Sequence, residues 1–427
     1  MAFTEYPLPN GSVLKNRIVK AAMEELMADV NNHNQPSQAM LKLYSAWGKG
    51  GSALILSGHV MIDPLAMASP GNTLLADHID GFDEKLWRQF VGGTKQDGAQ
   101  FYLQINHPGR QMRAVGDLGA IAPSAVPLKM GALSSMFPKP RAMTIEDIER
   151  VKGQFAWTAK KAEELGCDGV QIHAAHGYLL SQFLSPLSNV RTDQYGGTIE
   201  NRARLLFEIV RAIREQVSPA FGVGVKINSA DFQRGGFDND DLHFVVKQLN
   251  SMKVDFIELS GGSYEAAVMI EGHVASKYQA TTGKSASTLA REAYFIEAAQ
   301  GLEKIAEVPL IVTGGIRTKK TLDDVLATSP RLLAGIGVAL GLQPDLPNLW
   351  QRGEEAAPNV SPSIVLPKAF RGIAQTACVR WNMRAIGNGK STWHGVWPTL
   401  AFLVEEFSGL MQTMQYSRWL KAYQKKH

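Results

Sequence analysis

Eight short segments rich in Val, Ile and Leu recur along the chain. They are residues 17–22 (RIVKAA), 52–57 (SALILS), 100–104 (QFYLQ), 169–173 (GVQIH), 222–228 (GVGVKIN), 255–260 (DFIELS), 309–313 (PLIVT) and 332–337 (LLAGIG). Their apolar residues are continuous rather than alternating, which is typical of parallel strands that are buried on both faces. The sequence therefore predicts a parallel sheet built from these segments.

Segments with helical periodicity lie between the predicted strands. After Thr144, which with Asp147 forms a capping-box pattern, apolar residues fall on one helical face until Gly166 ends the helix. Residues 199–217 carry a second apolar stripe and are predicted to be one helix. Strands that alternate with helices predict an α/β protein of the (β/α)8 TIM-barrel type, with a doubly wound sheet as the alternative.

The last part of the chain has a different composition. Residues 361–427 hold nine Lys and Arg against two acidic residues, and five of the eight Trp lie at or after Trp350. We therefore expect a barrel over residues 1–350 and a basic, Trp-rich helical extension over 351–427. Its helices are expected to pack on the barrel or on another subunit, to be a solvated extension, to cover the active site, or to bind acidic lipid.

Composition excludes several classes of protein. Two cysteines, Cys167 and Cys378, are too few for a disulfide framework, a Cys-rich zinc site or a four-Cys iron–sulfur cluster. No run of about 18 apolar residues occurs, and the first residues lack a signal-peptide pattern. We expect a cytoplasmic protein with no membrane span and no nucleic-acid partner, and leave homo-oligomer formation open.

Active sites of TIM barrels lie at the carboxyl ends of the strands, which selects the residues to inspect. Gly314 and Gly315 follow the seventh strand, and Gly337 ends the eighth. Loops at these two positions commonly bind phosphate, because glycine lets backbone N–H groups approach the phosphate oxygens. With no dinucleotide fingerprint there, the expected ligand is a monophosphate, either a sugar phosphate or FMN.

Two imidazoles and a phenol follow the fourth strand, at His173, His176 and Tyr178. They are interpreted as hydrogen-bond donors to a substrate oxygen with Tyr178 as proton donor, as metal ligands, or as a buried structural group. A metal site needs further ligands, and His59 and His107 are available, but carboxylates at other strand ends are missing. A metal site is therefore not the leading interpretation of these residues.

Two more polar residues close apolar strands. An unpaired Lys226 ammonium would be costly to bury, so an anionic or strongly polar group is expected to face it. Gln104 offers a donor and an acceptor side by side, which suits a flat heterocycle with neighbouring N–H and C=O groups.

Together these motifs resemble the Old Yellow Enzyme family of FMN-dependent ene-reductases. The resemblance runs from about residue 6 to residue 349. It is carried by LKNRIVKAAM (14–23), QINHPGRQ (104–111), the long segment DGVQIHAAHGYLLSQFLSPLSNVRTDQYGGTIENRARLLFEIV (168–210), VGVKINSADF (223–232), IELSGG (257–262) and VTGGIRT (312–318).

The resemblance implies a role for each of these residues. The backbone at Ala22 and Met23 would lie by the reactive edge of FMN, Gln104 would meet the pyrimidine ring, and Lys226 would stand near N1 and O2. His173 and His176 would hold the carbonyl oxygen of the substrate, and Tyr178 would protonate the carbon α to it. Electrons would come from NADH or NADPH.

The sequence departs from the family pattern at two places. Glu24 stands where relatives commonly have Thr or Cys, and a carboxylate beside the flavin should lower its reduction potential. Gly337–Val338 stands where relatives typically have Gly-Arg, so one phosphate-binding cation is missing. We expect Arg317 to supply that charge.

The expected function is NAD(P)H-dependent reduction of an activated C=C bond in an α,β-unsaturated carbonyl or related small molecule. One alternative is a metal-dependent barrel hydrolase or lyase that uses His173 and His176. Another is a flavin-binding redox sensor without turnover, which Glu24 and Val338 suggest.

Overall fold

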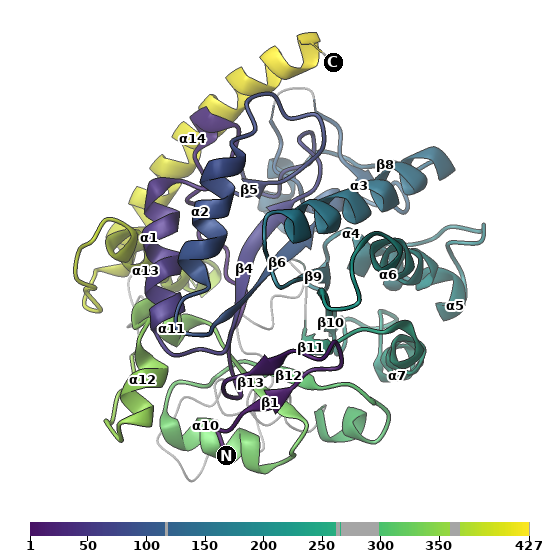
Figure 1. Ribbon diagram of the computed structural model, residues 1–427. Coiled ribbons are helices and arrows are strands. Elements are labelled where there is room, and N and C mark those ends of the chain that lie inside the picture. The colour runs from purple at the N-terminus through teal and green to yellow at the C-terminus, as the bar shows by residue number, and fades with distance from the viewer. Residues whose placement is uncertain (116–117, 262–264, 266–298, 359–367, 427) are drawn as a thin grey trace.

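A closed parallel barrel forms the centre of the computed structural model, which describes residues 1–115, 118–261, 265, 299–358 and 368–426 (Figure 1). Eight strands of the described residues form it in chain order: β3 (Ile18–Lys20), β4 (Leu54–Met61), β6 (Gln100–Asn106), β9 (Gly169–Ala174), β10 (Gly222–Asn228), β11 (Phe256–Ser260), β12 (Leu310–Thr313) and β13 (Leu332–Ile336). The ring closes because β3 pairs with both β13 and β4. The predicted TIM barrel is confirmed.

The barrel interior explains why the strand segments are apolar throughout. Val19, Leu54, Tyr102, Phe256 and Ile311 point into one buried inner cluster, while alternate residues of the same strands pack against the helices. Such a filled interior needs small residues opposite the aromatic rings. A Cβ atom on Gly224, for example, would lie only 2.2 Å from the Phe256 ring, which accounts for the glycine in strand β10.

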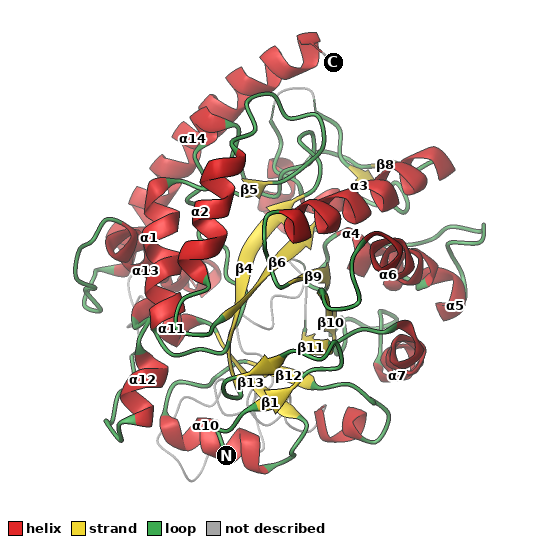
Figure 2. Cartoon of the chain, in the orientation of Figure 1, coloured by secondary structure: helices red, strands yellow, loops and turns green. Residues whose placement is uncertain are grey.

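Helices surround the barrel, as the red and yellow ribbons of Figure 2 show. The larger ones are α1 (Gln38–Lys49), α2 (Glu84–Thr94), α3 (Ile145–Glu164), α6 (Arg204–Gln216), α7 (Asn239–Leu249) and α10 (Lys319–Ala327). The capping box of Thr144 and Asp147 is confirmed at the start of α3, and Gly166 follows its end with a φ of +92°.

The predicted single helix over residues 199–217 is wrong, because Ala203 interrupts it and separates α5 (Ile199–Arg202) from α6. At the interruption the Arg202 side chain turns away to bind Asp241 and the Leu184 carbonyl.

Short elements complete the chain between these layers. They are the strands β1 (Tyr6–Pro7), β2 (Val13–Leu14), β5 (Thr73–Leu74), β7 (Ile121–Ala122) and β8 (Arg141–Ala142), the helices α4 (Leu179–Leu184), α11 (Val338–Leu342) and α12 (Leu346–Gln351), and the 3-10 turns Val30–Asn32, Gly109–Gln111, Gly131–Met136 and Asn250–Met252. Helix α12 runs through the expected domain boundary at residue 350, which stays a prediction.

Two long helices follow the barrel, α13 (Lys368–Gly387) and α14 (Pro398–Lys426), on the side of α1 in Figure 1. Helix α13 packs against α1 and α11 and buries Cys378 and Met383. Helix α14 is fixed by the Tyr416 hydroxyl, which donates to the Pro64 carbonyl (2.5 Å), and by Trp419, which donates to His33 (2.6 Å). The extension therefore packs on the barrel, and the expectation that it is simply solvated is wrong. Among the described helices, none is both long and apolar enough to span a membrane.

Candidate active site

All residues that the sequence singled out lie at the carboxyl end of the barrel. Gln104, His173 and Lys226 sit near the ends of β6, β9 and β10, and Ala22–Glu24 follow β3. The glycines and the cation expected at the phosphate follow the last two strands, at Gly314, Gly315, Arg317, Gly337 and Val338. Because neighbouring parallel strands end at the same edge, the barrel gathers these side chains on one face.

The imidazoles of His173 and His176 form a direct pair. His173 Nε2 lies 3.1 Å from His176 Nδ1, and His176 Nε2 lies 2.5 Å from the Ser260 hydroxyl oxygen. The backbone at His176 has a φ of +59°, and it is held because its N–H donates to Asn228 Oδ1 (3.0 Å). These contacts fix His176 between β9, β10 and β11.

One nitrogen of this pair has no partner in the part of the chain that the structure describes. His173 Nδ1 is buried without a hydrogen bond among the described residues, whereas both ring nitrogens of His176 are engaged. Two assignments of protons satisfy these contacts, and the one that leaves a donor has Ser260 O–H donating to His176 Nε2, His176 Nδ1–H donating to His173 Nε2, and a proton on His173 Nδ1. In that tautomer His173 presents one N–H to a bound molecule and His176 orients it.

Both histidines are neutral. Burial, and then the neighbouring His176, His59 and Lys226, lower the pKa of His173 well below its usual value. Burial, and then Lys226 and His59, do the same to the pKa of His176. Neutral imidazoles suit a site that must bind an oxygen atom by hydrogen bonds without carrying a charge of its own.

Tyr178 and His59 complete the group of rings. The Tyr178 ring lies 5.0 Å from the His173 ring and 4.9 Å from the His59 ring, measured between ring centroids, and both contacts are edge-on. Asn106 lies 3.3 Å from His59 Nδ1, and its own Oδ1 atom is buried without a partner among the described residues. The structure therefore brings the predicted His173, His176 and Tyr178 together and places His59, which the sequence offered as a further ligand, beside them.

A polar chain crosses the barrel interior one layer below the rings. Gln104 donates to Gln171 (2.7 Å), and Gln171 donates to Glu258 (2.6 Å). Glu258 also accepts from the Lys226 ammonium (2.8 Å) and from the Thr313 hydroxyl (2.7 Å). The expectation that an anionic group faces Lys226 is confirmed, and that group is Glu258.

Sequence reasoning missed Gln171 and Glu258. Gln171 precedes His173 by two residues, and Glu258 precedes Ser260 by two, so each pair points to the same side of its strand. A period-two search outward from the recognised site residues would have found them.

Glu24 is held by the C-terminal helix α13. The Arg380 guanidinium donates to the Glu24 carboxylate (2.6 Å) and to its backbone oxygen (2.8 Å), and Asn72 donates to the other carboxylate oxygen (3.1 Å). Burial raises the pKa of Glu24, but Arg380, His59 and Asn72 together outweigh it and hold the pKa below its usual value. Glu24 is thus an ionised, neutralised carboxylate, and Arg380 is a site residue that no local sequence pattern signalled.

The opposite side of the barrel mouth is rich in glycine. Gly314 and Gly315 have φ values of +142° and +71°, conformations that residues with a Cβ rarely adopt. Gly337 lies against the Met23 side chain, with an added Cβ 3.7 Å from its Cγ and Sδ atoms. Backbone approach is therefore open at this point, as a phosphate group requires.

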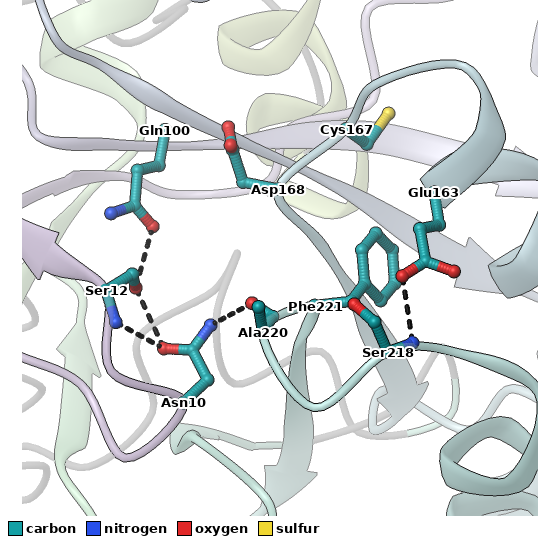
Figure 3. Close-up of a pocket in the computed structure, with 9 residues that line it drawn as sticks. All are labelled: Asn10, Ser12, Gln100, Glu163, Cys167, Asp168, Ser218, Ala220 and Phe221. Atoms are coloured by element: carbon teal, nitrogen blue, oxygen red, sulfur yellow. Dashed lines mark hydrogen bonds between the residues drawn. The ribbon is translucent and has the colours of Figure 1, made fainter.

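A separate cavity of about 220 Å³ lies at the other end of the barrel (Figure 3). It is lined by residues at the amino ends of β6, β9 and β10, such as Gln100, Asp168 and Phe221, and by Ser12 next to β2. Because barrel chemistry takes place at the carboxyl ends, this cavity is not the active site.

The residues present fit a flavin mononucleotide. Gln104 and Lys226 would offer hydrogen bonds to a flat ring, and the glycines would let the backbone approach a phosphate. Among the described residues, His173 Nδ1 and Asn106 Oδ1 are buried without a partner. A TIM barrel with this arrangement defines the class of FMN-dependent oxidoreductases.

Comparison with known proteins gives the family. Residues 7–356 match the model of the NADH:flavin oxidoreductase / NADH oxidase family, and the chain belongs to this family. The NADH-dependent flavin oxidoreductase nadA of Aspergillus parasiticus is 34% identical over 391 residues, which cover 87% of this chain and 82% of nadA. The NADH-dependent flavin oxidoreductase iliE of a Neonectria species is 39% identical over 352 residues, 79% of this chain but only 45% of that protein.

Solved structures show the same fold. The old yellow enzyme homologue from Zymomonas mobilis has a TM-score of 0.66 at 21% identity, over 84% of this chain and 94% of its own. A 2-naphthoyl-CoA reductase has a TM-score of 0.74 at 21% identity, over 91% of this chain and 57% of its own. The resemblance to Old Yellow Enzymes, the enzyme class, FMN as cofactor and a reduced nicotinamide donor are confirmed by these matches. They favour the flavin interpretation over the metal-dependent hydrolase.

Proposed function

We propose that the protein reduces the activated C=C bond of an α,β-unsaturated carbonyl or a related small molecule. The observation that carries this proposal is the Nδ1 atom of His173, which has no hydrogen-bond partner among the described residues, lies buried beside Tyr178 and is backed by the His176–Ser260 pair. Reduction of an enone develops negative charge on the carbonyl oxygen and requires a proton at the α carbon. His173 offers a fixed neutral donor for the carbonyl oxygen, and the Tyr178 phenol offers a proton for the α carbon.

FMN supplies the hydride when it is bound, and the protein supplies orientation and charge. His173 Nδ1–H would donate to the carbonyl oxygen, with a geometry that is set before the substrate arrives. His176 would act through His173, since both of its ring nitrogens are already occupied. Tyr178 would deliver the proton from the adjacent ring position.

The cofactor would be held by residues from five strand ends. These are the backbone of Ala22 and Met23, Glu24, Gln104, Lys226, Gly314, Gly315, Arg317, Gly337 and Val338. An ammonium carries three N–H groups, so the bond of Lys226 to Glu258 does not use up its donors. The pairing of Glu24 with Arg380 removes the net negative charge that would otherwise oppose flavin reduction.

Anaerobic rapid mixing tests the proposal in two half-reactions. FMN-loaded protein mixed with NADH or NADPH should lose its blue absorbance, and 2-cyclohexenone should then restore it in the absence of oxygen. A flavin that is reduced but that no enone reoxidises would reject the reductase and favour the redox sensor. Protein that fails to bind FMN at all would reject both.

A further inference from the structure

The outward face of helix α14 is apolar over half of its length. Its barrel-facing side buries Ala401, Glu405 and Tyr416. The opposite side carries seven large apolar side chains that are between 39% and 67% exposed: Leu400, Leu403, Val404, Phe407, Leu410, Met411 and Met414. In Figure 1 this helix, drawn in yellow, runs along the edge of the molecule. A surface helix normally turns polar residues outward, so this face is built to be covered.

The size of the face matches a stable protein interface. Seven half-exposed side chains of this kind present roughly 100 Å² each, or on the order of 700 Å² together. Each partner of a standard interface contributes about 800 Å², whereas the largest patch of a typical monomer covers about 300–600 Å². Trp397, at the start of the helix, is 55% exposed and extends the same surface.

The seven positions are symmetric about Phe407. Leu403 and Leu400 precede it at four and seven residues, and Met411 and Met414 follow it at the same distances. Val404 and Leu410 lie three residues on either side. A two-fold axis at Phe407 would therefore place every member of the set opposite another member, which is the self-complementarity that a two-fold interface requires.

We propose that two copies of this chain pair through this face, with their α14 helices antiparallel and crossing at Phe407. Phe407 of one copy then meets Phe407 of the other, Leu403 meets Met411, and Leu400 meets Met414. Packing of apolar side chains at three- and four-residue spacing is the ordinary means by which two helices associate.

Charge selects the antiparallel direction. The exposed face continues beyond Met414 as Arg418, Lys421 and Lys425. A parallel pair would align these cations with their own copies, and like charges would repel. An antiparallel pair separates them and brings each basic end beside the start of the other helix, where Trp397 can accept a cation over its ring.

The pairing does not depend on the proposed activity. It acts on the helix that also braces the site, because Gln412 donates to the Leu26 carbonyl (3.1 Å) and Glu405 binds Arg380 (3.2 Å). A second copy would thus cover the outer side of a helix whose inner side holds the segment after β3.

Light scattering coupled to size-exclusion chromatography tests the pairing on the full-length, FMN-loaded protein. The measured mass of the wild type should be twice the chain mass of 46.6 kDa. The mass of Phe407→Asp should be that of one chain, with an unchanged circular dichroism spectrum. Val190→Asp, a substitution of a 62% exposed residue outside α14, is the matched control and should remain dimeric. A monomeric wild type at tens of micromolar would overturn the proposal, and a monomer that floats with anionic vesicles would assign the face to lipid instead.

Cysteine cross-linking tests the direction and the crossing point. Cys167 and Cys378 are buried, so an introduced surface cysteine should be the reactive one. Under oxidation Phe407→Cys should form a covalent dimer, and Leu400→Cys should form one only when mixed with Met414→Cys. A Leu400→Cys protein that cross-links to itself as readily as Phe407→Cys would show parallel helices and overturn the antiparallel pairing.

Discussion

His173, His176 and Tyr178 form one packed group because their contacts are interdependent. His173 offers an N–H at Nδ1 only if His176 donates to its Nε2 atom, and the other nitrogen of His176 then accepts from the Ser260 hydroxyl. Tyr178 packs edge-on against His173, so its hydroxyl is positioned relative to whatever His173 binds. The chemistry of the site therefore resides in the arrangement more than in any single side chain.

Replacement of the phenol tests the proton donor. Tyr178→Phe should slow reoxidation of the reduced enzyme by 2-cyclohexenone about 100-fold, since general acid catalysis contributes on this scale or above. Reduction of the flavin by NADH or NADPH should stay within about twofold of the wild type, because it needs no such proton. Stopped-flow absorbance measures both rates, and an equal loss in the two half-reactions would contradict the assigned role.

Alanine substitutions separate the two histidines. A phenol serves as the probe, because its oxygen can take the place of the substrate oxygen beside His173. His173→Ala should weaken its binding to the oxidised enzyme roughly 10- to 100-fold, the effect of losing a hydrogen bond to a charged oxygen. His176→Ala should weaken it less, because His176 acts through His173. Titration of the absorbance change on phenol binding gives both affinities. Equal losses would show that His176 contacts the ligand itself, as the family resemblance implies.

At the scale of elements, helix α13 contributes to the site from outside the barrel. Arg380 binds the side chain and the backbone of Glu24, and it also contacts Glu405 of α14. Arg384 binds the same Glu405. The segment after β3 is thus fixed to both C-terminal helices by alternating charges.

Removal of the guanidinium should disturb Glu24 specifically. Arg380→Met should lower the free energy of unfolding by about 2 kcal/mol and weaken FMN binding, because it leaves a largely buried carboxylate without its cation. Glu24→Gln in the same chain should recover part of both losses. Urea unfolding and fluorescence titration of FMN provide the measurements. Arg384→Met is the matched control, and an FMN affinity lowered equally by both single variants would argue against a specific role for Arg380.

At the scale of the whole molecule, the C-terminal helices are part of the folded unit. Helix α13 buries Ala377, Cys378 and Met383 against the barrel helices, and the Trp47 indole donates to the Leu340 carbonyl at the neighbouring surface. Loss of this cover would expose apolar residues of α1 and α11 to water.

Truncation measures how much the barrel depends on this cover. A chain that ends at Leu349 should aggregate or melt far below the wild type. Burial of each large apolar side chain stabilises the fold by about 1.5–3 kcal/mol, so the loss of several is a large part of a free energy of unfolding of about 5–15 kcal/mol. A chain that ends at Lys390 keeps α13 and should fold with a smaller loss. Calorimetry compares them, and an unchanged melting temperature after truncation at Leu349 would show the extension to be dispensable.

Buried histidines should make stability depend on pH. Burial lowers the pKa of His59 and of His107 to about 4, whereas an unfolded histidine titrates near 6.5. Below pH 6.5 these histidines therefore take up protons in the unfolded chain but stay neutral in the folded chain, and the free energy of unfolding falls as the pH drops toward 4. Each such histidine contributes up to about 1.4 kcal/mol per pH unit in this window.

His107→Asn isolates one of these contributions. The Asn oxygen can still accept the Gly109 N–H that His107 Nδ1 accepts, but it does not titrate. Urea unfolding between pH 5 and 6.5 should show a shallower dependence, by up to about 1.4 kcal/mol per pH unit at the low end of this range. An unchanged dependence would show that His107 is protonated in the folded state.

The sequence by itself determined the buried parallel strands and the residues at their carboxyl ends, whereas the pairing of β3 with both β13 and β4 decided that the sheet closes into a barrel. Continuous apolar runs identify strands buried on both faces, and the carboxyl ends of those strands contain His173, Lys226 and Gly314 whatever the surrounding packing. These features are local, since a period and a strand end can be read within a few residues.

Only the tertiary structure decided which of these groups meet. It paired Lys226 with Glu258, joined Glu24 to Arg380 across most of the chain, and left His173 Nδ1 without a partner among the described residues. It also showed that one face of α14 packs on the barrel while the other remains apolar and exposed. Contacts between residues this distant depend on the packing of whole elements, and no local pattern carries that information.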